Sequence, residues 1–234
     1  TIQTMIYDHS QASYIFLPYI TSGLFDYSGS RIIITFNIPT DYGAAVLTNI
    51  NDLWQCSQIF QFHGADEASC IWNDQQTVIV TLNYYSQSNE LISPGDPILL
   101  LPHVIKGICL TNSSSICQKY PFSPVSIVNS TIPKTHILPQ ATLITSSTHL
   151  LCSDLIIDAS QSYGHGSRKW KLIQWKIFST NEVSSILSLL TAHTNLDTPI
   201  TIPSSLLQVG TYTISLGLLN FLQNMNDQIV YTTI

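Results

Sequence analysis

The stretch RIIITFNI, residues 31–38, alternates along the chain with a period of two. Ile32, Ile34, Phe36 and Ile38 fall on the same side, and polar residues fill most of the positions between them. Successive side chains of a β-strand point to opposite faces, so this period puts one face of a strand into a core. The stretch therefore predicts a half-buried β-strand.

The same period recurs at Val78, Val80 and Leu82 and again at Tyr212, Ile214, Leu216 and Leu218. Shorter apolar runs lie between these stretches, and turn signals such as SPGD at residues 93–96 separate many of them. Many short strands joined by turns are typical of β-sandwiches. We expect an all-β fold built of tandem β-sandwich domains of the immunoglobulin or PKD type.

One segment has helical rather than strand periodicity. Ser179 and Glu182 have the spacing of a capping box, and apolar residues follow at helical intervals in residues 183–190. This predicts one short helix in the second domain.

A proline-bearing stretch with little apolar periodicity, residues 129–140, separates two modules. We expect domains at residues 1–134 and 135–234, with residues 1–23 as a candidate lead-in from a preceding module. The chain begins without an initiator Met and ends on a strand-like run, which indicates a fragment of a longer protein.

The composition is poor in charge, with 9% charged and 44% hydrophobic residues and a net charge of −6. No basic stripe follows the chain, so we expect no nucleic-acid partner. The longest apolar run, near residues 98–105, is far shorter than the roughly 20 residues of a membrane helix, so we expect no membrane span. Hydroxyl and amide side chains suit exposed strands and glycan attachment.

Five cysteines are present and none has the Cys-x-x-Cys spacing of zinc or redox sites. We expect disulfides between Cys56 and Cys70 and between Cys109 and Cys117. Cys152 is then unpaired, or bonds to Cys109, to Cys117 or to another chain, because spacing alone does not fix the connectivity.

Two N-glycosylation sequons begin at Asn112 and Asn129. Together with the cysteines and the low charge, they predict a secreted or cell-surface location.

Catalytic motifs are not found in the sequence. It has no Gly-x-Ser-x-Gly elbow, phosphate loop, dinucleotide fingerprint or helical zinc motif. We expect no enzyme activity, no cofactor and no metal site. Scattered carboxylates are candidate calcium ligands at a hinge, but no Asp-x-Asp run supports that reading; they are Asp66, Glu67, Asp96, Asp154 and Asp158.

Half of the basic residues lie in residues 168–176, interleaved with two tryptophans. One interpretation is a surface that binds acidic glycans through Arg168, Lys169, Trp170 and Lys171. The other, which we favour, is a strand with apolar residues inward and basic residues outward.

The stretches CSDLIIDASQSYGHGSRKWKLIQW, residues 152–175, and GTYTISLGLLN, residues 210–220, resemble the receptor-for-egg-jelly (REJ) module and its PKD-type, immunoglobulin-like relatives. Immunoglobulin-like sandwiches have a central Trp on strand C and a Tyr that closes a corner at strand F, and Trp175 and Tyr212 fit these places. Ile214 stands where an antibody domain has its second Cys, so no inter-sheet disulfide is expected.

The stretches RIIITFNIPTD, CIWNDQQTVIVTL and SPGDPILL resemble the companion half of such modules in surface proteins, so the resemblance covers most of residues 24–234. It implies a non-catalytic extracellular domain of a large protein, such as a polycystin-like receptor, a ciliary or flagellar filament, or a gamete-surface protein. We expect a structural or adhesive module that contacts neighbouring modules or copies of itself, as a homo-oligomer or filament. The alternative is a glycan- or ligand-binding ectodomain that uses residues 168–176.

Overall fold

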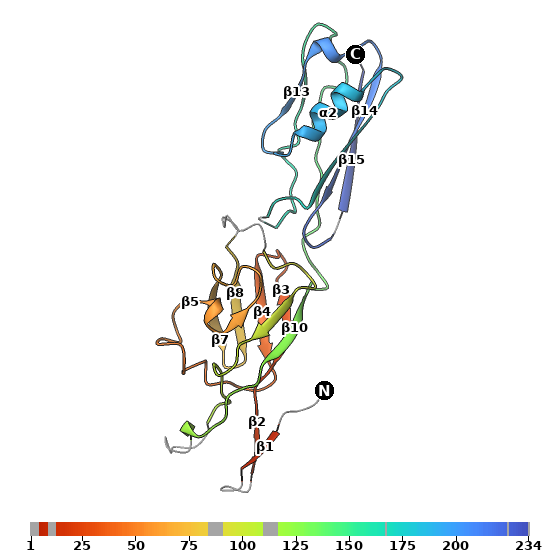
Figure 1. Ribbon diagram of the computed structural model, residues 1–234. Coiled ribbons are helices and arrows are strands. Elements are labelled where there is room, and N and C mark those ends of the chain that lie inside the picture. The colour runs from red at the N-terminus through yellow and green to blue at the C-terminus, as the bar shows by residue number, and fades with distance from the viewer. Residues whose placement is uncertain are drawn as a thin grey trace. The chain divides into compact units, whose positions relative to one another are not determined.

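The regular structure is mostly β-sheet, seen in a computed structural model that describes residues 5–8, 13–83, 91–109, 117–166, 168–223 and 225–233 (Figure 1). A short helix, α2 at Ser184–Ala192, lies in the second half of the chain. The predicted all-β class and short helix are confirmed. The chain divides into two units, Thr1–His136 and Ile137–Ile234, here called unit 1 and unit 2. No helix among the described residues is long and apolar enough to span a bilayer.

Unit 1 contains ten described strands and the short 3-10 helix η1 at Cys56–Gln58. The strands are β1 Met5–Asp8, β2 Ser13–Phe16, β3 Ile20–Phe25, β4 Arg31–Phe36, β5 Trp54–Gln55, β6 Phe60–Gln61, β7 Ser69–Asp74, β8 Thr77–Thr81, β9 Pro97–Leu100 and β10 Ser126–Thr131. β1 and β2 pair with each other, and the other eight form one sheet in the order β5-β7-β8-β4-β3-β10-β9-β6. β3 therefore places the last residues of the 1–23 stretch in this sheet.

The sheet of unit 1 curls around its core. Its two outermost strands, β5 and β6, are joined in the chain by η1 and Ile59, so the ends of the strand order are held close together. All its pairings are antiparallel except that of β3 with β10. The inner face of each long strand carries apolar side chains that form the core, as the period of two predicts. Ile34 of β4, for example, lies opposite Val78 of β8, and both are fully buried.

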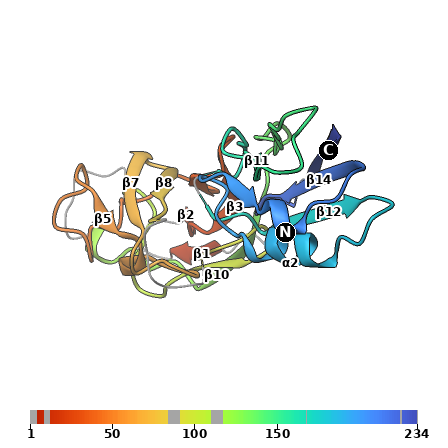
Figure 2. The same ribbon diagram turned by 90° about the horizontal axis from the view of Figure 1, so that it is seen from above.

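Unit 2 contains two sheets, α2 and the 3-10 helix η2 at Ser204–Leu206. The strands are β11 Leu155–Ile157, β12 Leu172–Phe178, β13 Ile200–Ile202, β14 Thr211–Leu219 and β15 Met225–Thr233. β11 pairs with β13, and β12, β14 and β15 form an antiparallel sheet with β14 in the middle. β14 and β15 lie side by side in Figure 1, and β12 and β14 do so in Figure 2.

One core joins the two sheets of unit 2. Leu155 and Ile202 come from the first sheet, Trp175 and Leu216 come from the second, and α2 adds Leu190. The three residues of β11 are buried, exposed and buried in turn, which is the pattern of a strand with one face on a core. α2 also contacts β12 and β13, so it closes the core between the two sheets.

The start of α2 differs from the predicted capping box. The helix begins at Ser184, and neither Ser179 nor Glu182 lies within it. The Glu182 carboxylate accepts a hydrogen bond from Ser184 N at 2.8 Å, and Ser179 Oγ accepts one from Asn181 N at 3.3 Å. Ser179 satisfies a donor of the turn and Glu182 satisfies the N–H of the first helical residue, so the two do not form a capping box and that prediction is wrong although the helix exists.

Candidate functional site

Two disulfides lie in unit 1. Cys56 and Cys70, whose Cα atoms are 5.1 Å apart, join η1 to β7, and both are fully buried. Cys109 and Cys117 join two points on either side of residues 110–116, with their Cα atoms 5.4 Å apart. Cys152 of unit 2 is a free, exposed cysteine. The structure thus brings together four of the five cysteines in two local pairs.

Of the two sequon asparagines, Asn129 lies among the described residues. Asn112 lies outside the described residues. Asn129 is exposed on β10, next to Ser130, which is buried and donates its hydroxyl hydrogen bond to Ser93 O at 2.8 Å. The Asn129 side chain is therefore open to modification while its sequon neighbour is fixed in the sheet.

The candidate glycan-binding residues, Arg168 to Lys171, precede strand β12. β12 begins at Leu172, so the predicted continuous strand over residues 168–176 is wrong. The Arg168 guanidinium carbon lies 3.9 Å from the ring centre of Phe221. Trp170 is partly buried against the core of unit 2. A guanidinium stacked on a ring and a Trp held by packing present less free surface than an extended strand would.

Lys169 and Lys171 flank Trp170 and are both exposed. Lys171 donates its backbone N–H to Leu219 O at 2.8 Å, which fixes the turn just before β12. Among the described residues, no ion pair holds either ammonium group.

Tyr212 and Trp175 lie in the core of unit 2. Tyr212 is 1% exposed and Trp175 is 4% exposed. The Tyr212 hydroxyl donates to Gln208 O at 3.1 Å and accepts a hydrogen bond from Gln208 N at 2.9 Å. The side-chain amide of Asn181 also donates to this hydroxyl, at 3.4 Å. These bonds hold the chain where it enters β14.

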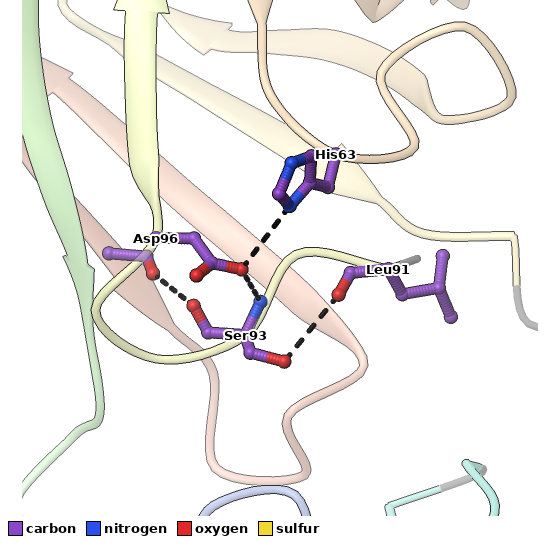
Figure 3. Close-up of polar contacts among 5 residues, drawn as sticks. His63, Leu91, Ser93 and Asp96 are labelled. Carbon is purple, nitrogen blue, oxygen red and sulfur yellow. Dashed lines mark hydrogen bonds and ion pairs between the residues drawn. The ribbon is translucent and has the colours of Figure 1, made fainter. Parts of the chain in front are cut away.

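A polar group in unit 1 has the residue types of a hydrolytic triad but a different geometry. His63 Nδ1 lies 3.6 Å from Asp96 Oδ2, and the same carboxylate oxygen accepts a hydrogen bond from Ser93 N at 2.7 Å (Figure 3). The Ser93 hydroxyl points instead to Leu91 O, at 3.5 Å (Figure 3). The carboxylate thus fixes the turn through the backbone of Ser93, and the histidine is not aligned on the serine hydroxyl.

The carboxylates considered for calcium are spread over both units. Asp154 accepts a hydrogen bond from Ser204 N, and Asp158 accepts one from Ser160 N, both at 2.8 Å. The hydrogen bonds from Ser160 lower the pKa of Asp158. In the part of the chain that the structure describes, no three His, Cys, Asp or Glu residues gather as metal ligands would. The five carboxylates are Asp66, Glu67, Asp96, Asp154 and Asp158.

One carboxylate of unit 1 has the opposite pKa shift. Burial raises the pKa of Asp41, and hydrogen bonds from the backbone N–H groups of Lys106 and Gly43, together with the Lys106 charge, partly oppose this effect. The Asp41 Oδ1 atom accepts these bonds at 2.9 and 3.1 Å. Asp41 therefore anchors the loop after β4 to the segment around Lys106.

The outer surface of the sheet β12-β14-β15, here called the outer face of unit 2, carries large exposed apolar side chains. Leu172, Phe178, Met225 and Ile229 are 44%, 61%, 47% and 52% exposed. They alternate with the inward-facing residues of β12 and β15, so they share one side of the sheet. Leu172 and Met225 lie level with each other across β14, whereas Gln174 and Lys176 separate Leu172 from Phe178 on the same face. Large apolar side chains gathered on one exposed face indicate an interaction site. The outer face is the strongest candidate for a functional surface.

Sequence reasoning missed the outer face. The alternation of β12 was visible, but an outward apolar residue cannot be told from a buried one until its strand neighbours are known. The signal was the large apolar residue at outward positions of both edge strands, Phe178 and Ile229, where a solvated strand would have polar ones.

Comparison with models of known protein families found no match, and a search among curated proteins found none either.

Proposed function

We propose that the chain is an extracellular structural or adhesive module, part of a large cell-surface or filament protein. The observation that carries the proposal is the connectivity of unit 2. Ile144 bridges to Asp158, β11 pairs with β13, and β12, β14 and β15 form the second sheet. This order corresponds to strands A, B and E and strands C, F and G of an immunoglobulin-like sandwich.

The hydrogen-bonded corner of Tyr212 and the buried Trp175 support the same interpretation. A tyrosine corner before strand F and a core Trp on strand C are typical of this architecture, and here they lie on β14 and β12. They also support the resemblance to REJ and PKD-type modules, which in turn implies the surface of a cell, cilium or flagellum. Unit 1, whose eight-stranded sheet curls around its core, is proposed as the companion half of that module.

The disulfides support an oxidising compartment. Structural disulfides persist in secreted and cell-surface proteins and are rare in the cytosol. The Cys56–Cys70 bond is fully buried, so it is part of the core of unit 1. The exposed Asn129 sequon fits the same compartment.

The low charge of the chain and its exposed apolar residues favour a role in protein–protein contacts. The chain has only 9% charged residues, and unit 2 presents the outer face with four large apolar side chains. Such a surface loses little hydration energy when a neighbour covers it. We propose that it contacts a neighbouring module or another copy of the chain.

Peptide mapping of the natively purified protein under non-reducing conditions tests the extracellular premise. We expect Cys56 bonded to Cys70, Cys109 bonded to Cys117, and a glycan on Asn129 that a glycosidase removes. Free thiols together with unmodified sequons would refute the proposal.

A second candidate function is the binding of acidic glycans, which the exposed Lys169 and Lys171 on either side of Trp170 favour. Saturable binding of heparin that is lost in the double variant Trp170→Ala, Lys171→Ala would support this function. Lys134→Ala is the control because it removes one exposed charge in unit 1, outside residues 168–176. A chain that binds no polysaccharide would exclude it.

A further inference from the structure

We infer that the outer face of unit 2 binds the same face of a second copy of this chain across a two-fold axis. The inference rests on the proposed function and names the partner that the outer face takes.

The outer face has two charged residues of opposite sign on opposite edge strands. Lys176 lies on β12 and Asp227 lies on β15, and both are exposed. Among the described residues, neither forms an ion pair within the chain. The register places Lys176 level with Ile229, and Asp227 level with Gln174, so the two charges lie on a diagonal across β14.

This arrangement is complementary to itself. A two-fold axis that lies in the plane between the two copies and runs perpendicular to this diagonal exchanges the two positions, so Lys176 of each copy meets Asp227 of the other. A two-fold interface uses one patch twice, so every contact is made in duplicate. Opposite charges at exchangeable positions favour such a partner, whereas a face with charges of one sign would repel its own copy.

The sizes of the side chains fit a flat sheet-to-sheet contact. The middle strand contributes the small residues Ser215 and Gly217, both buried beneath their neighbours. A Cβ at Gly217 would meet the Asp227 carboxylate, and it would lie 2.9 Å from the Met225 terminal methyl. The side chains of Asp227 and Met225 on β15 therefore extend over Gly217 of β14 and fill the space above this small residue. Two sheets pack in this way, about 10 Å apart, when both present side chains of even height.

The apolar residues supply the attraction and the charges set the alignment. Leu172, Phe178, Met225 and Ile229 surround the charged diagonal, so closure removes apolar surface on both copies from water. The two ion pairs of the dimer would lie among them, where they are less screened by salt than on an open surface.

Sedimentation velocity of the 234-residue chain across micromolar concentrations tests the inference. We expect a concentration-dependent dimer, and we expect Lys176→Glu and Asp227→Lys each to weaken it by about tenfold or more through like-charge contacts. The combined variant Lys176→Glu, Asp227→Lys restores opposite charges and should recover dimerisation to within a few-fold of the parent. Both positions are exposed, so the substitutions leave the core intact.

Ile229→Arg should abolish the dimer, whereas Ile156→Arg is the matched control. Ile156 is 56% exposed, close to the 52% of Ile229, but it lies on the outer side of β11 in the other sheet. A dimer that survives Ile229→Arg, or that Ile156→Arg disrupts equally, would overturn the inference, as would a double charge variant that stays dissociated.

The outcome is separable from that of the proposed function. A monomer at all concentrations, from protein with mapped disulfides and a glycan on Asn129, would refute the second copy as partner and leave the extracellular role standing. A dimer formed by protein with free thiols and bare sequons would do the reverse.

Discussion

Tyr212 and Gln208 are joined by two hydrogen bonds: the phenol hydroxyl donates to Gln208 O at 3.1 Å and accepts from Gln208 N at 2.9 Å. The ring itself is buried in the core of unit 2. One side chain thus satisfies both backbone groups of a residue four positions earlier, and it anchors the start of β14 to the connection that precedes it. The corner links local chain geometry to the packing of the two sheets.

Removing the hydroxyl in Tyr212→Phe should destabilise unit 2. The ring still fills its place, but the N–H and carbonyl of Gln208 lose their partner, which costs about 1–3 kcal/mol. Urea unfolding followed by tryptophan fluorescence measures the change. Tyr163→Phe is the control because Tyr163 is 58% exposed, and we expect it to change the free energy of unfolding by less than about 0.5 kcal/mol. Equal effects of the two variants would contradict a stabilising corner.

The disulfide within the core of unit 1 should contribute strongly to stability. Cys56 and Cys70 are separated by 14 positions, and a loop of that size is expected to contribute about 3 kcal/mol through the entropy of the unfolded chain. The double variant Cys56→Ala, Cys70→Ala should therefore lower the stability of unit 1 by about this amount or more, since both sulfurs are buried. Cys152→Ser, at the exposed free cysteine, should leave the unfolding curve unchanged. A double variant as stable as the parent would contradict this role.

The long strands could be predicted from sequence because one face of each is buried. In β4 and β8 the apolar positions that alternate in the sequence are the ones that meet in the core, with Ile32 opposite Val80. An alternation of apolar and polar residues can be recognised in a sequence only when it extends over several residues. The two-residue strands β5 and β6, which bring the ends of the sheet together, are too short to show it.

Features that depend on which hydrogen-bond donor, core surface or neighbouring strand a side chain meets could not be predicted from the sequence. The spacing of Ser179 and Glu182 matched a capping box, but Ser179 binds Asn181 N in the preceding turn and Glu182 binds the N–H of Ser184, the first residue of α2. The place of Trp170 against the core, instead of on an open strand, depends on the turn that precedes β12. The outer face required knowledge of strand neighbours, because the exposure of Phe178 and Ile229 is set by which strands lie beside them.

Gly164 should tolerate a side chain much less well than Gly95 does. Both have positive φ, +99° and +98°, so an alanine at either is strained by about 1–2 kcal/mol. A Cβ at Gly164 would also collide with the backbone of Leu138 and lie 2.7 Å from Pro139 Cα, whereas no heavy atom lies within 4 Å of a Cβ at Gly95. Thermal unfolding should therefore show a clearly larger loss for Gly164→Ala than for Gly95→Ala. Similar losses would mean that the backbone at Leu138 yields without cost.

As pH falls, Asp41 and Asp74 should change the free energy of unfolding of unit 1 in opposite directions. Burial raises the pKa of Asp41, so its contribution to stability is present below the unfolded pKa and is lost as pH rises through the folded one. A hydrogen bond from Gln76 N, at 2.7 Å, is the main cause that lowers the pKa of Asp74. The contribution of Asp74 is therefore present above the unfolded pKa and is lost as pH falls through the folded one.

Urea unfolding of the variants Asp41→Asn and Asp74→Asn across the range from neutral pH to about pH 3 separates the two effects. An asparagine oxygen at position 41 can accept the same bonds from Lys106 and Gly43 without a buried charge. Asp41→Asn should thus match or exceed the parent in stability at neutral pH, with the difference shrinking toward acid. Asp74→Asn should be less stable than the parent at neutral pH, and this deficit should shrink as acid protonates Asp74 in the parent. Two variants whose differences from the parent have the same sign at neutral pH would show that burial does not dominate at Asp41.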